Sequence, residues 1–334
     1  MKKYGALMCA LSFLFGAFFF CGGEAYGAEY KEFKLSNQFP PSHYISKGMV
    51  IFADNVKKYS GGSLQCKVFD SAQLYKDTEI VEALQDGLVE SGLVPTNKWS
   101  GMIPAMDVFE VPFAFKDLPS IKKFLDGGAA KLLGAEFPSK GVVNLFWVDY
   151  GYVQFFNNKC PIKTPADMKG LTMRAFSGGD AETLLALGAA PTIMSSSEMY
   201  MALQRGTVDG ATTGMPAAVS RKIFEVQKYM TLSNYACAQF VVQGNKKWWD
   251  TLSAKDKAAV TQAGRDTEAW IRGELAASEL AALKTIKEAK VQVHELSDAE
   301  HKQFIAATAP VWQKFEDKAG DLGKRLIDIV RKTN

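Results

Sequence analysis

Two stretches of the chain follow the same pattern, about 120 residues apart. Glu79 is followed by ALQDGLVE at residues 83–90, and Glu198 is followed by ALQRGTVD at residues 202–209. Each copy predicts a helix, a glycine that ends it, and a strand followed by small polar residues. The spacing is too wide for a solenoid. The repeat therefore favours two similar lobes, each with a polar loop at a strand end.

The rest of the pattern alternates short apolar runs with longer stretches of helical period. We predict strands and helices in turn, which indicates an α/β fold with mixed sheets. Two such lobes that face each other form a cleft at the strand ends, where ligands of open α/β sheets bind. The predicted strands are residues 33–36, 64–69, 142–148, 171–175 and 240–243, and the main helices are residues 45–59, 78–86 and 181–187.

The last third of the chain differs from what precedes it. Residues 253–290 are rich in Ala, Glu, Leu and Lys and lack proline, and Ser253 and Asp256 have capping-box spacing. We predict one long helix that braces the two lobes, a short strand or loop at 291–293, and a final helical pair.

The first residues predict export. Lys2 and Lys3 precede an apolar run over residues 6–20, and small residues follow up to Ala28. This run is shorter than the roughly 20 residues that span a bilayer, and it has the form of a secretory signal. We therefore assign residues 1–28 to a cleaved signal peptide and expect a periplasmic, soluble mature protein.

Charge and cysteine content exclude some classes. The net charge is +3 over 334 residues, without a basic cluster, so nucleic acid is not an expected partner. Outside the predicted signal lie Cys66, Cys160 and Cys237. Because their number is odd, at least one is unpaired within the chain. The pattern leaves open whether any two pair, and we favour three free thiols.

An exported two-lobed cleft protein has the architecture of a periplasmic binding protein, with a hinge between the lobes. We expect residues 29–151 and 240–279 to form the first lobe. Residues 152–239 and 280–334 should form the second lobe with the C-terminal helices. A mature chain of about 305 residues is large enough for two cores.

Four segments resemble the solute-binding proteins of TRAP transporters, the dicarboxylate-binding type. They are PIKTPADMKGLTMR at 161–174, SEMYMALQRGTVDG at 197–210, SAQL at 71–74 and VPF at 111–113. The resemblance implies that an organic acid binds between two α/β lobes spanned by a long helix. It also implies delivery of the acid to a membrane permease, with no cofactor or metal. We expect a monomer.

Arg174 is the principal candidate binding residue. In the family, an arginine at this position holds the ligand carboxylate through a two-pronged salt bridge. The residues agree, because Arg174 ends a predicted strand and Ser177 precedes the next predicted helix. A planar guanidinium and free helix N–H groups both suit an anion. The alternative is an arginine that pairs with Asp180.

Other candidates follow from the resemblance and from their positions. Thr213 replaces the amide that the family commonly has, Ser196 replaces an aromatic ring of sialic-acid binders, and Val153 replaces their second arginine. The last departure weakens the case for sialic acid or a diacid. Further candidates lie in the crossover between lobes or in first-lobe loops: Tyr150, Tyr152, Tyr235 and Gln239, and Gln38, His43, Thr96, Asn97 and Trp99.

One charged anchor in a partly aromatic pocket favours a monocarboxylate with an apolar or aromatic body, including a 2-oxo or 2-hydroxy acid. An enzyme is not expected, since the chain lacks a nucleophile turn, a phosphate loop and a dinucleotide fingerprint. His294, Glu295 and His301 do not have zinc-motif spacing. A ligand-binding sensor or adaptor for a signalling receptor would have the same fold and remains an alternative.

Overall fold

The chain adopts the predicted α/β architecture in a computed structural model, which describes residues 30–333. The predicted signal peptide lies outside the described residues. One nine-stranded mixed sheet runs through the molecule in the order β2-β1-β3-β8-β4-β7-β5-β6, with β9 paired to β8. The strands are β1 (Lys31–Ser36), β2 (Leu64–Phe69), β3 (Ser91–Pro95), β4 (Val142–Asn157), β5 (Thr172–Ala175), β6 (Ala190–Ile193), β7 (Gly210–Gly214), β8 (Tyr229–Asn245) and β9 (Gln292–Glu295).

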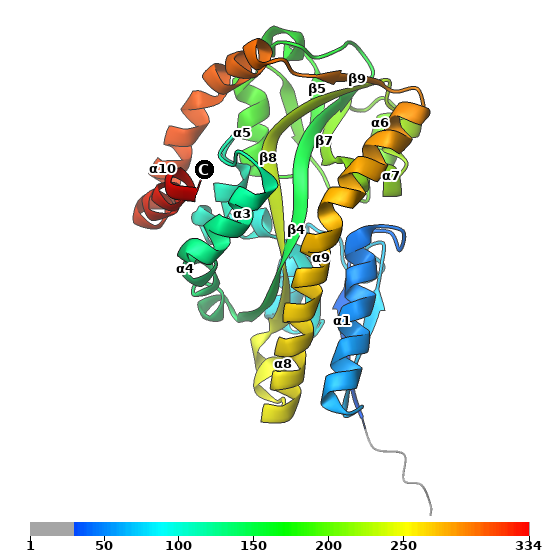
Figure 1. Ribbon diagram of the computed structural model, residues 1–334, viewed down its shortest axis with the longest axis vertical. Coiled ribbons are helices and arrows are strands. Elements are labelled where there is room, and N and C mark those ends of the chain that lie inside the picture. Colours follow the sequence, from blue (N-terminus) through cyan, green and yellow to red (C-terminus); the bar gives the residue numbers. More distant parts are fainter. Residues whose placement is uncertain (1–29, 334) are drawn as a thin grey trace, which may run out of the picture.

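Two long antiparallel strands, β4 and β8, connect two similar halves of this sheet (Figure 1). In one half β3 lies beside β8 and pairs in parallel with β1. In the other half β7 lies beside β4 and pairs in parallel with β5. The two halves are the two lobes of the predicted fold, which is confirmed.

The internal repeat produces equivalent elements in the two lobes. Helix α2 (Ile80–Asp86) ends at Gly87 and leads to β3, whereas α6 (Met199–Gln204) is followed by Gly206 and leads to β7. Both glycines have positive φ values, 72° and 69°, which turn the chain out of the helix without steric cost. The polar residues after each copy therefore reach the same region, between the lobes.

The remaining helices cover the sheet and connect its strands. They are α1 (Tyr44–Ser60), α3 (Leu118–Phe124), α4 (Ala130–Gly134), α5 (Gly178–Ala186), α7 (Met215–Ser220), α8 (Lys246–Asp250), α9 (Ala254–Glu288) and α10 (Asp298–Thr333). Short 3₁₀ helices include η1 (Thr96–Trp99), η2 (Pro104–Glu110), η4 (Pro138–Lys140), η5 (Pro165–Met168) and η6 (Ile223–Glu225), and a π-helical turn is η3 (Leu125–Ala129). No helix among residues 30–333 combines the length and apolar character needed to cross a membrane.

Helix α9 is the predicted bracing helix, and it runs along both lobes (Figure 1). The Ser253 hydroxyl caps it by accepting from the Asp256 N–H at 3.1 Å. Its 35 residues span about 50 Å. Ile271 and Leu275 join the core that contains α1 and β4, and Ile286 joins the core of the second lobe around β7.

Helix α10 is the predicted final helical pair, because its backbone breaks at Gly320 (φ 58°, ψ −143°). We predicted residues 280–334 to lie with the second lobe. The end of α10 instead packs on the first: Phe315, Leu326 and Ile327 share a core with Phe109 of η2 and Phe124 of α3. These apolar side chains follow a helical spacing that suits either lobe, so the pattern alone does not select one.

Candidate functional site

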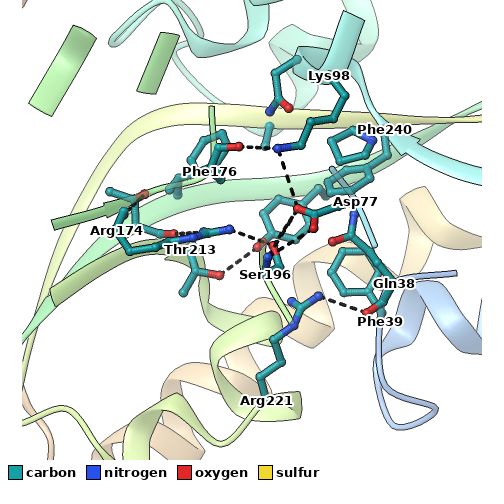
Figure 2. A pocket seen from close by; sticks show the side chains of 16 residues that line it. Gln38, Phe39, Asp77, Lys98, Arg174, Phe176, Ser196, Thr213, Arg221 and Phe240 are labelled. Carbon is teal, nitrogen blue, oxygen red and sulfur yellow. Dashed lines mark hydrogen bonds and ion pairs between the residues drawn. The ribbon is translucent and has the colours of Figure 1, made fainter. Parts of the chain in front are cut away.

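A partly open pocket lies between the lobes, where β3 and β7 end (Figure 2), and its empty space of about 390 Å³ includes adjoining solvent. Both copies of the repeat contribute to the wall, through Pro95, Asn97 and Lys98 on one side and Thr212 and Thr213 on the other. The other lining residues are Gln38, Phe39, Asp77, Tyr150, Val153, Arg174, Phe176, Ser196, Arg221, Ala238 and Phe240.

Arg174 is almost fully buried in this wall, with 1% of its surface exposed. Its Nε and Nη2 both donate to the Met194 carbonyl, at 3.2 and 3.1 Å, and Nη1 donates to the Thr212 carbonyl at 3.0 Å. Nη2 also donates to the Ser196 hydroxyl at 2.9 Å. Within residues 30–333, no carboxylate lies within 4 Å of this guanidinium as an ion pair. A buried, unpaired positive charge is a strong binding position for an anion.

Asp180, the alternative partner of Arg174, is engaged elsewhere. Its carboxylate accepts from the Tyr235 and Thr212 hydroxyls and from the Phe176 N–H. Ser177 caps α5 by accepting from the Asp180 N–H at 3.0 Å. The acid therefore ties β5, β7 and β8 together beneath Arg174.

A second arginine, Arg221, directly follows α7, and its side chain extends into the pocket. Its guanidinium carbon lies 4.8 Å from the centre of the Phe39 ring, and Nη2 donates to the Gln38 carbonyl at 3.3 Å. Figure 2 shows Arg221 approaching from the side of α7, while Arg174 lies across the pocket. Like Arg174, it forms no ion pair within 4 Å among the residues described. Stacking on an aromatic ring suits a guanidinium better than an ammonium.

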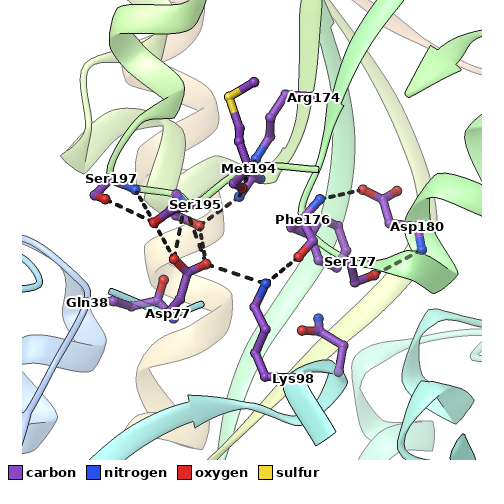
Figure 3. Close-up of polar contacts among 12 residues, drawn as sticks. Gln38, Asp77, Lys98, Arg174, Phe176, Ser177, Asp180, Met194, Ser195 and Ser197 are labelled. Carbon is purple, nitrogen blue, oxygen red and sulfur yellow. Dashed lines mark hydrogen bonds and ion pairs between the residues drawn. The ribbon is translucent and has the colours of Figure 1, made fainter. Parts of the chain in front are cut away.

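Asp77 and Lys98, both of the first lobe, form an ion pair, and each also bonds a group of the second lobe (Figure 3). Lys98 Nζ lies 3.8 Å from the Asp77 carboxylate and donates to the Phe176 carbonyl at 2.7 Å. The same carboxylate accepts from the Ser195 hydroxyl and from the Ser196 N–H. Burial alone would raise the pKa of Asp77, but Lys98, Ser195 and the two arginines outweigh it and hold the pKa below its ordinary value.

Tyr150 and Thr213 form a hydroxyl pair at the end of β7. The Tyr150 hydroxyl accepts from the Gly214 N–H at 2.8 Å and lies 3.2 Å from the Thr213 hydroxyl. Whichever of the two donates in that bond, one hydroxyl hydrogen remains for another acceptor. The pair therefore adds a hydrogen-bond donor to a wall that already carries two guanidinium groups.

Six of the twelve predicted site residues line the pocket: Gln38, Asn97, Tyr150, Arg174, Ser196 and Thr213. The other six lie outside its wall. His43 caps α1, where its Nδ1 accepts from the Ile45 N–H at 3.2 Å and its ring stacks on Phe39. His43 thus supports a lining ring from behind.

The remaining predicted residues serve the strands around the pocket. Thr96 donates to the Gln239 carbonyl, and Gln239 Nε2 donates to Asp149. Trp99 donates to the Gln243 side chain inside the first-lobe core, next to which Tyr152 also packs. Tyr235 stacks on Phe155 and donates to Asp180.

Sequence reasoning missed Asp77, Lys98 and Arg221, as well as the rings of Phe39, Phe176 and Phe240. For Lys98 a signal existed, because it lies between Asn97 and Trp99, which were both selected. Asp77 follows the SAQL segment by three residues, and Arg221 follows α7. Neither position carries a local pattern that distinguishes it from a solvated charge.

The described part of the chain has neither a cluster for a metal ion nor paired cysteines. Residues 30–333 contain no cluster of three or more His, Cys, Asp or Glu side chains that suits a metal ion. Cys66, Cys160 and Cys237 are all free. The arrangement in the pocket can bind and orient an anion.

Comparison with known proteins agrees with this geometry. A family model described as bacterial extracellular solute-binding protein, family 7, matches residues 35–318. The C4-dicarboxylate-binding periplasmic protein DctP of Rhodobacter capsulatus is 33% identical over 291 residues, which cover 86% of this chain and 87% of that protein.

Solved structures show the same fold. The sugar acid binding protein DctPAm of Advenella mimigardefordensis, in complex with galactonate, superposes with a TM-score of 0.89 at 29% identity, over 92% of this chain and 99% of that one. A TRAP periplasmic solute-binding protein of Sulfurospirillum deleyianum with bound succinate superposes with a TM-score of 0.87 at 29% identity, over 92% and 100%.

Proposed function

Because this chain belongs to the bacterial extracellular solute-binding proteins of family 7, we propose that it captures an organic acid in the pocket around Arg174. The family resemblance predicted from sequence is confirmed, as is the expectation that the protein acts outside the cytoplasm. The protein is a transport component and not an enzyme. It serves a TRAP transporter for organic acids and works with the membrane permease components of that transporter.

The observation that carries the site assignment is the pair of buried arginines, without carboxylate ion-pair partners within 4 Å among the described residues, that line one pocket. A carboxylate that enters the pocket meets the Arg174 fork, held rigidly by three backbone contacts, and the hydroxyl pair of Tyr150 and Thr213. These bonds leave one Nη1 hydrogen free, and displacement of the Ser196 hydroxyl by the ligand would free an Nη2 hydrogen, so that a planar fork meets both carboxylate oxygens. We assign the carboxylate of the ligand to this side of the pocket.

The finer proposal concerns the rest of the ligand. Rings of Phe39, Tyr150, Phe176 and Phe240 line the pocket, together with Val153. These surfaces suit an apolar or aromatic body, so we propose a monocarboxylate, with 2-oxo and 2-hydroxy acids included. Relatives bind varied acids: DctP of Rhodobacter capsulatus is named for C4-dicarboxylates, and solved relatives hold galactonate and succinate.

A diacid is the second candidate, and Arg221 favours it. This guanidinium faces the same pocket as Arg174 and stacks on Phe39. Arg221→Met keeps much of the apolar stem and removes the charge. A diacid that uses both arginines would lose affinity by roughly one and a half decades or more in this variant, whereas a monocarboxylate would lose far less.

Thermal melting of the mature protein against a library of organic acids tests the function. A ligand that binds only the native state raises the melting temperature by mass action. We expect one class of acid to raise the melting temperature of the wild-type protein but not that of Arg174→Ala. If no acid shifts the protein after it has been unfolded, freed of any bound solute and refolded, the assignment of the pocket fails. We also propose a monomer, which light scattering of the purified protein tests directly.

A further inference from the structure

Two amide side chains in the pocket wall each keep one polar atom without a partner. Asn97 and Gln38 are 8% and 6% exposed, and both line the pocket. Among residues 30–333, no group forms a hydrogen bond with Asn97 Oδ1 or Gln38 Nε2. Buried polar atoms in native proteins are nearly always paired, because an unpaired one loses its water without compensation. These two atoms therefore indicate polar groups that a ligand supplies.

The orientation of Asn97 is set by Glu110, a residue with 2% exposure at the end of η2. Asn97 Nδ2 donates to Glu110 Oε1, and the Ser177 hydroxyl of the other lobe hydrogen-bonds Glu110 Oε2. The nitrogen end of the amide is thus bound to the carboxyl group. The oxygen end is left as a hydrogen-bond acceptor for the pocket.

Three of the four charged side chains in the pocket wall only donate. Arg174, Arg221 and Lys98 have only donors, and the Tyr150–Thr213 pair offers a hydroxyl hydrogen. The Asp77 carboxylate is already engaged by Lys98, Ser195 and Ser196. Asn97 Oδ1 needs a donor, which a carboxylate cannot provide, since its oxygens only accept. An ammonium group would donate but would be repelled by the three cations.

We propose that the site selects an organic acid that also carries a hydroxyl group, whose hydrogen is accepted by Asn97 Oδ1. Glu110 is the positioning residue that holds Asn97 in this orientation. Gln38 Nε2 donates to an oxygen of the same ligand. This proposal rests on the proposed function and narrows it to hydroxy acids.

Matched pairs of acids test the selectivity. Titration calorimetry would compare malate with succinate, 2-hydroxyisocaproate with isocaproate, and 3-phenyllactate with 3-phenylpropionate. In the pair that binds most tightly, we expect the hydroxy acid to bind at least about tenfold more tightly than its counterpart, because the counterpart leaves Asn97 Oδ1 unpaired. Equal or tighter binding of the counterpart would overturn the proposal. If only acids without a hydroxyl bind, the proposal fails while the proposed function stands; if no acid binds the refolded protein, both fail.

Substitutions distinguish a role of Asn97 in selecting the ligand hydroxyl from a purely structural role. Asn97→Leu should reduce the affinity for the hydroxy acid about tenfold. Its affinity for the acid without the hydroxyl should stay within about twofold of the wild-type value. Thr213→Val is the matched control, since it removes a donor to the carboxylate and should weaken both members alike. A loss in Asn97→Leu that is equal for both members would mean a structural role only.

Glu110 is tested by rescue. Glu110→Gln retains the arrangement, because the amide oxygen accepts from Asn97 and the amide nitrogen donates to Ser177. Glu110→Leu removes it. The measured quantity is the ratio of the affinity for the hydroxy acid to the affinity for its counterpart without the hydroxyl. We expect this ratio to stay near the wild-type value in Glu110→Gln and to fall about tenfold in Glu110→Leu. A ratio that is unchanged in Glu110→Leu contradicts the positioning role. If the melting curve shows that Glu110→Leu does not fold, Asn97→Leu decides the selection.

Discussion

Arg174 is already fixed in the direction of the pocket by the backbone. Two of its nitrogens share the Met194 carbonyl, and a third bonds the Thr212 carbonyl. A guanidinium held in this way loses little conformational entropy when a carboxylate binds. The binding energy of the contact is therefore reduced little by the cost of ordering the arginine.

Replacing Arg174 tests the anchor directly. Truncating one member of a buried charge pair costs roughly 2–5 kcal/mol, so Arg174→Ala should weaken binding by about one and a half to four decades. Arg174→Lys keeps the charge without the fork, and we expect a smaller but clear loss. Calorimetry gives both dissociation constants. Circular dichroism confirms that each variant is folded, and an affinity equal to wild type in Arg174→Ala would exclude Arg174 as the anchor.

Residues at strand ends were the ones that sequence could identify. Arg174 lies next to the last residue of β5 and Thr213 next to the last residue of β7, so a predicted strand was enough to place them at the cleft. Asp77, Lys98 and Arg221 reach the pocket through long or loop-borne side chains whose direction depends on the packing of both lobes. Their local sequence does not differ from that of solvated charges, which explains why three charged lining residues were missed.

Glu279 is a buried acidic residue of the long bracing helix α9. It is 9% exposed, and neither carboxyl oxygen has a side-chain partner in the described part of the chain. Its carboxyl group packs against Gly151 of β4, which has φ +99° beside a β-bulge in the crossover. Burial raises the pKa of Glu279 to about 8. At neutral pH the group is therefore predominantly protonated.

Glu279→Gln should change how stability depends on pH. In the folded protein the carboxyl group holds its proton up to about pH 8, whereas in the unfolded chain it releases the proton near its ordinary value of 4.5. The unfolded state then binds fewer protons across this window, so the free energy of unfolding of wild type falls as pH rises, by up to about 1.4 kcal/mol per pH unit. The glutamine variant lacks this loss. Urea titrations at pH 5 and pH 8 should show the variant gaining on wild type at the higher pH.

The same difference between variant and wild type at both pH values would mean that Glu279 titrates normally. The backbone N–H of Tyr152 opposes this rise in the pKa of Glu279, and it remains in the variant, which isolates the carboxyl group. At pH 5 the proton-linked loss of wild-type stability should be much smaller than at pH 8, because pH 5 lies only just above the pKa of 4.5 in the unfolded chain.

The elements themselves were largely predictable, and the crossover strands were not. Strand β2 matches its predicted range, and α9 differs by a residue or two at each end. We predicted only residues 142–148 of β4, which continues to Asn157. Asp149 and Gly151 interrupt the apolar pattern there, at a bulge where the long strand bends between lobes. Pairing with β8 along its whole length stabilises the strand despite that interruption, and a long-range pairing leaves no local signal.

At the scale of the whole molecule, the structure has the lobes in contact around the pocket. Besides Asp77 and Lys98, Arg221 bonds the Gln38 carbonyl across the cleft and Lys76 pairs with Glu198 at 2.8 Å. The repeat predicted two lobes that face each other. It did not predict which polar groups meet, because that depends on how the lobes are rotated about β4 and β8.

We predict that Glu110 and Asp107 couple closure of the lobes to pH. Both carboxyl groups belong to the first lobe, and the backbone of α5 in the second lobe covers them: a Cβ on Gly179 would lie 2.7 Å from Glu110 Oε2 and 3.3 Å from Asp107 Cγ. Burial, with the neighbouring Asp107 as a smaller cause, holds the pKa of Glu110 well above its usual range, and burial raises that of Asp107 to about 6. Separation of the lobes would return both groups to water. Closure on a ligand should therefore take up protons.

Ligand affinity should accordingly decrease as pH rises above about 6. A carboxylate ligand is fully ionised in this range, so the slope of log Kd against pH counts the protons taken up by the protein, at most about one for each group that titrates. Lys318 and Glu182 also face Asp107, and Asp180 lies near Glu110, but all three remain in the variant that isolates the effect. Glu110→Gln cannot take up the proton, so its affinity should vary less steeply between pH 6 and pH 9. Calorimetry in buffers of different ionisation enthalpy measures the proton uptake directly. A wild-type profile that is flat over this range, or a glutamine variant with the same slope, would show that the two carboxyl groups keep the same protonation in the open and closed protein.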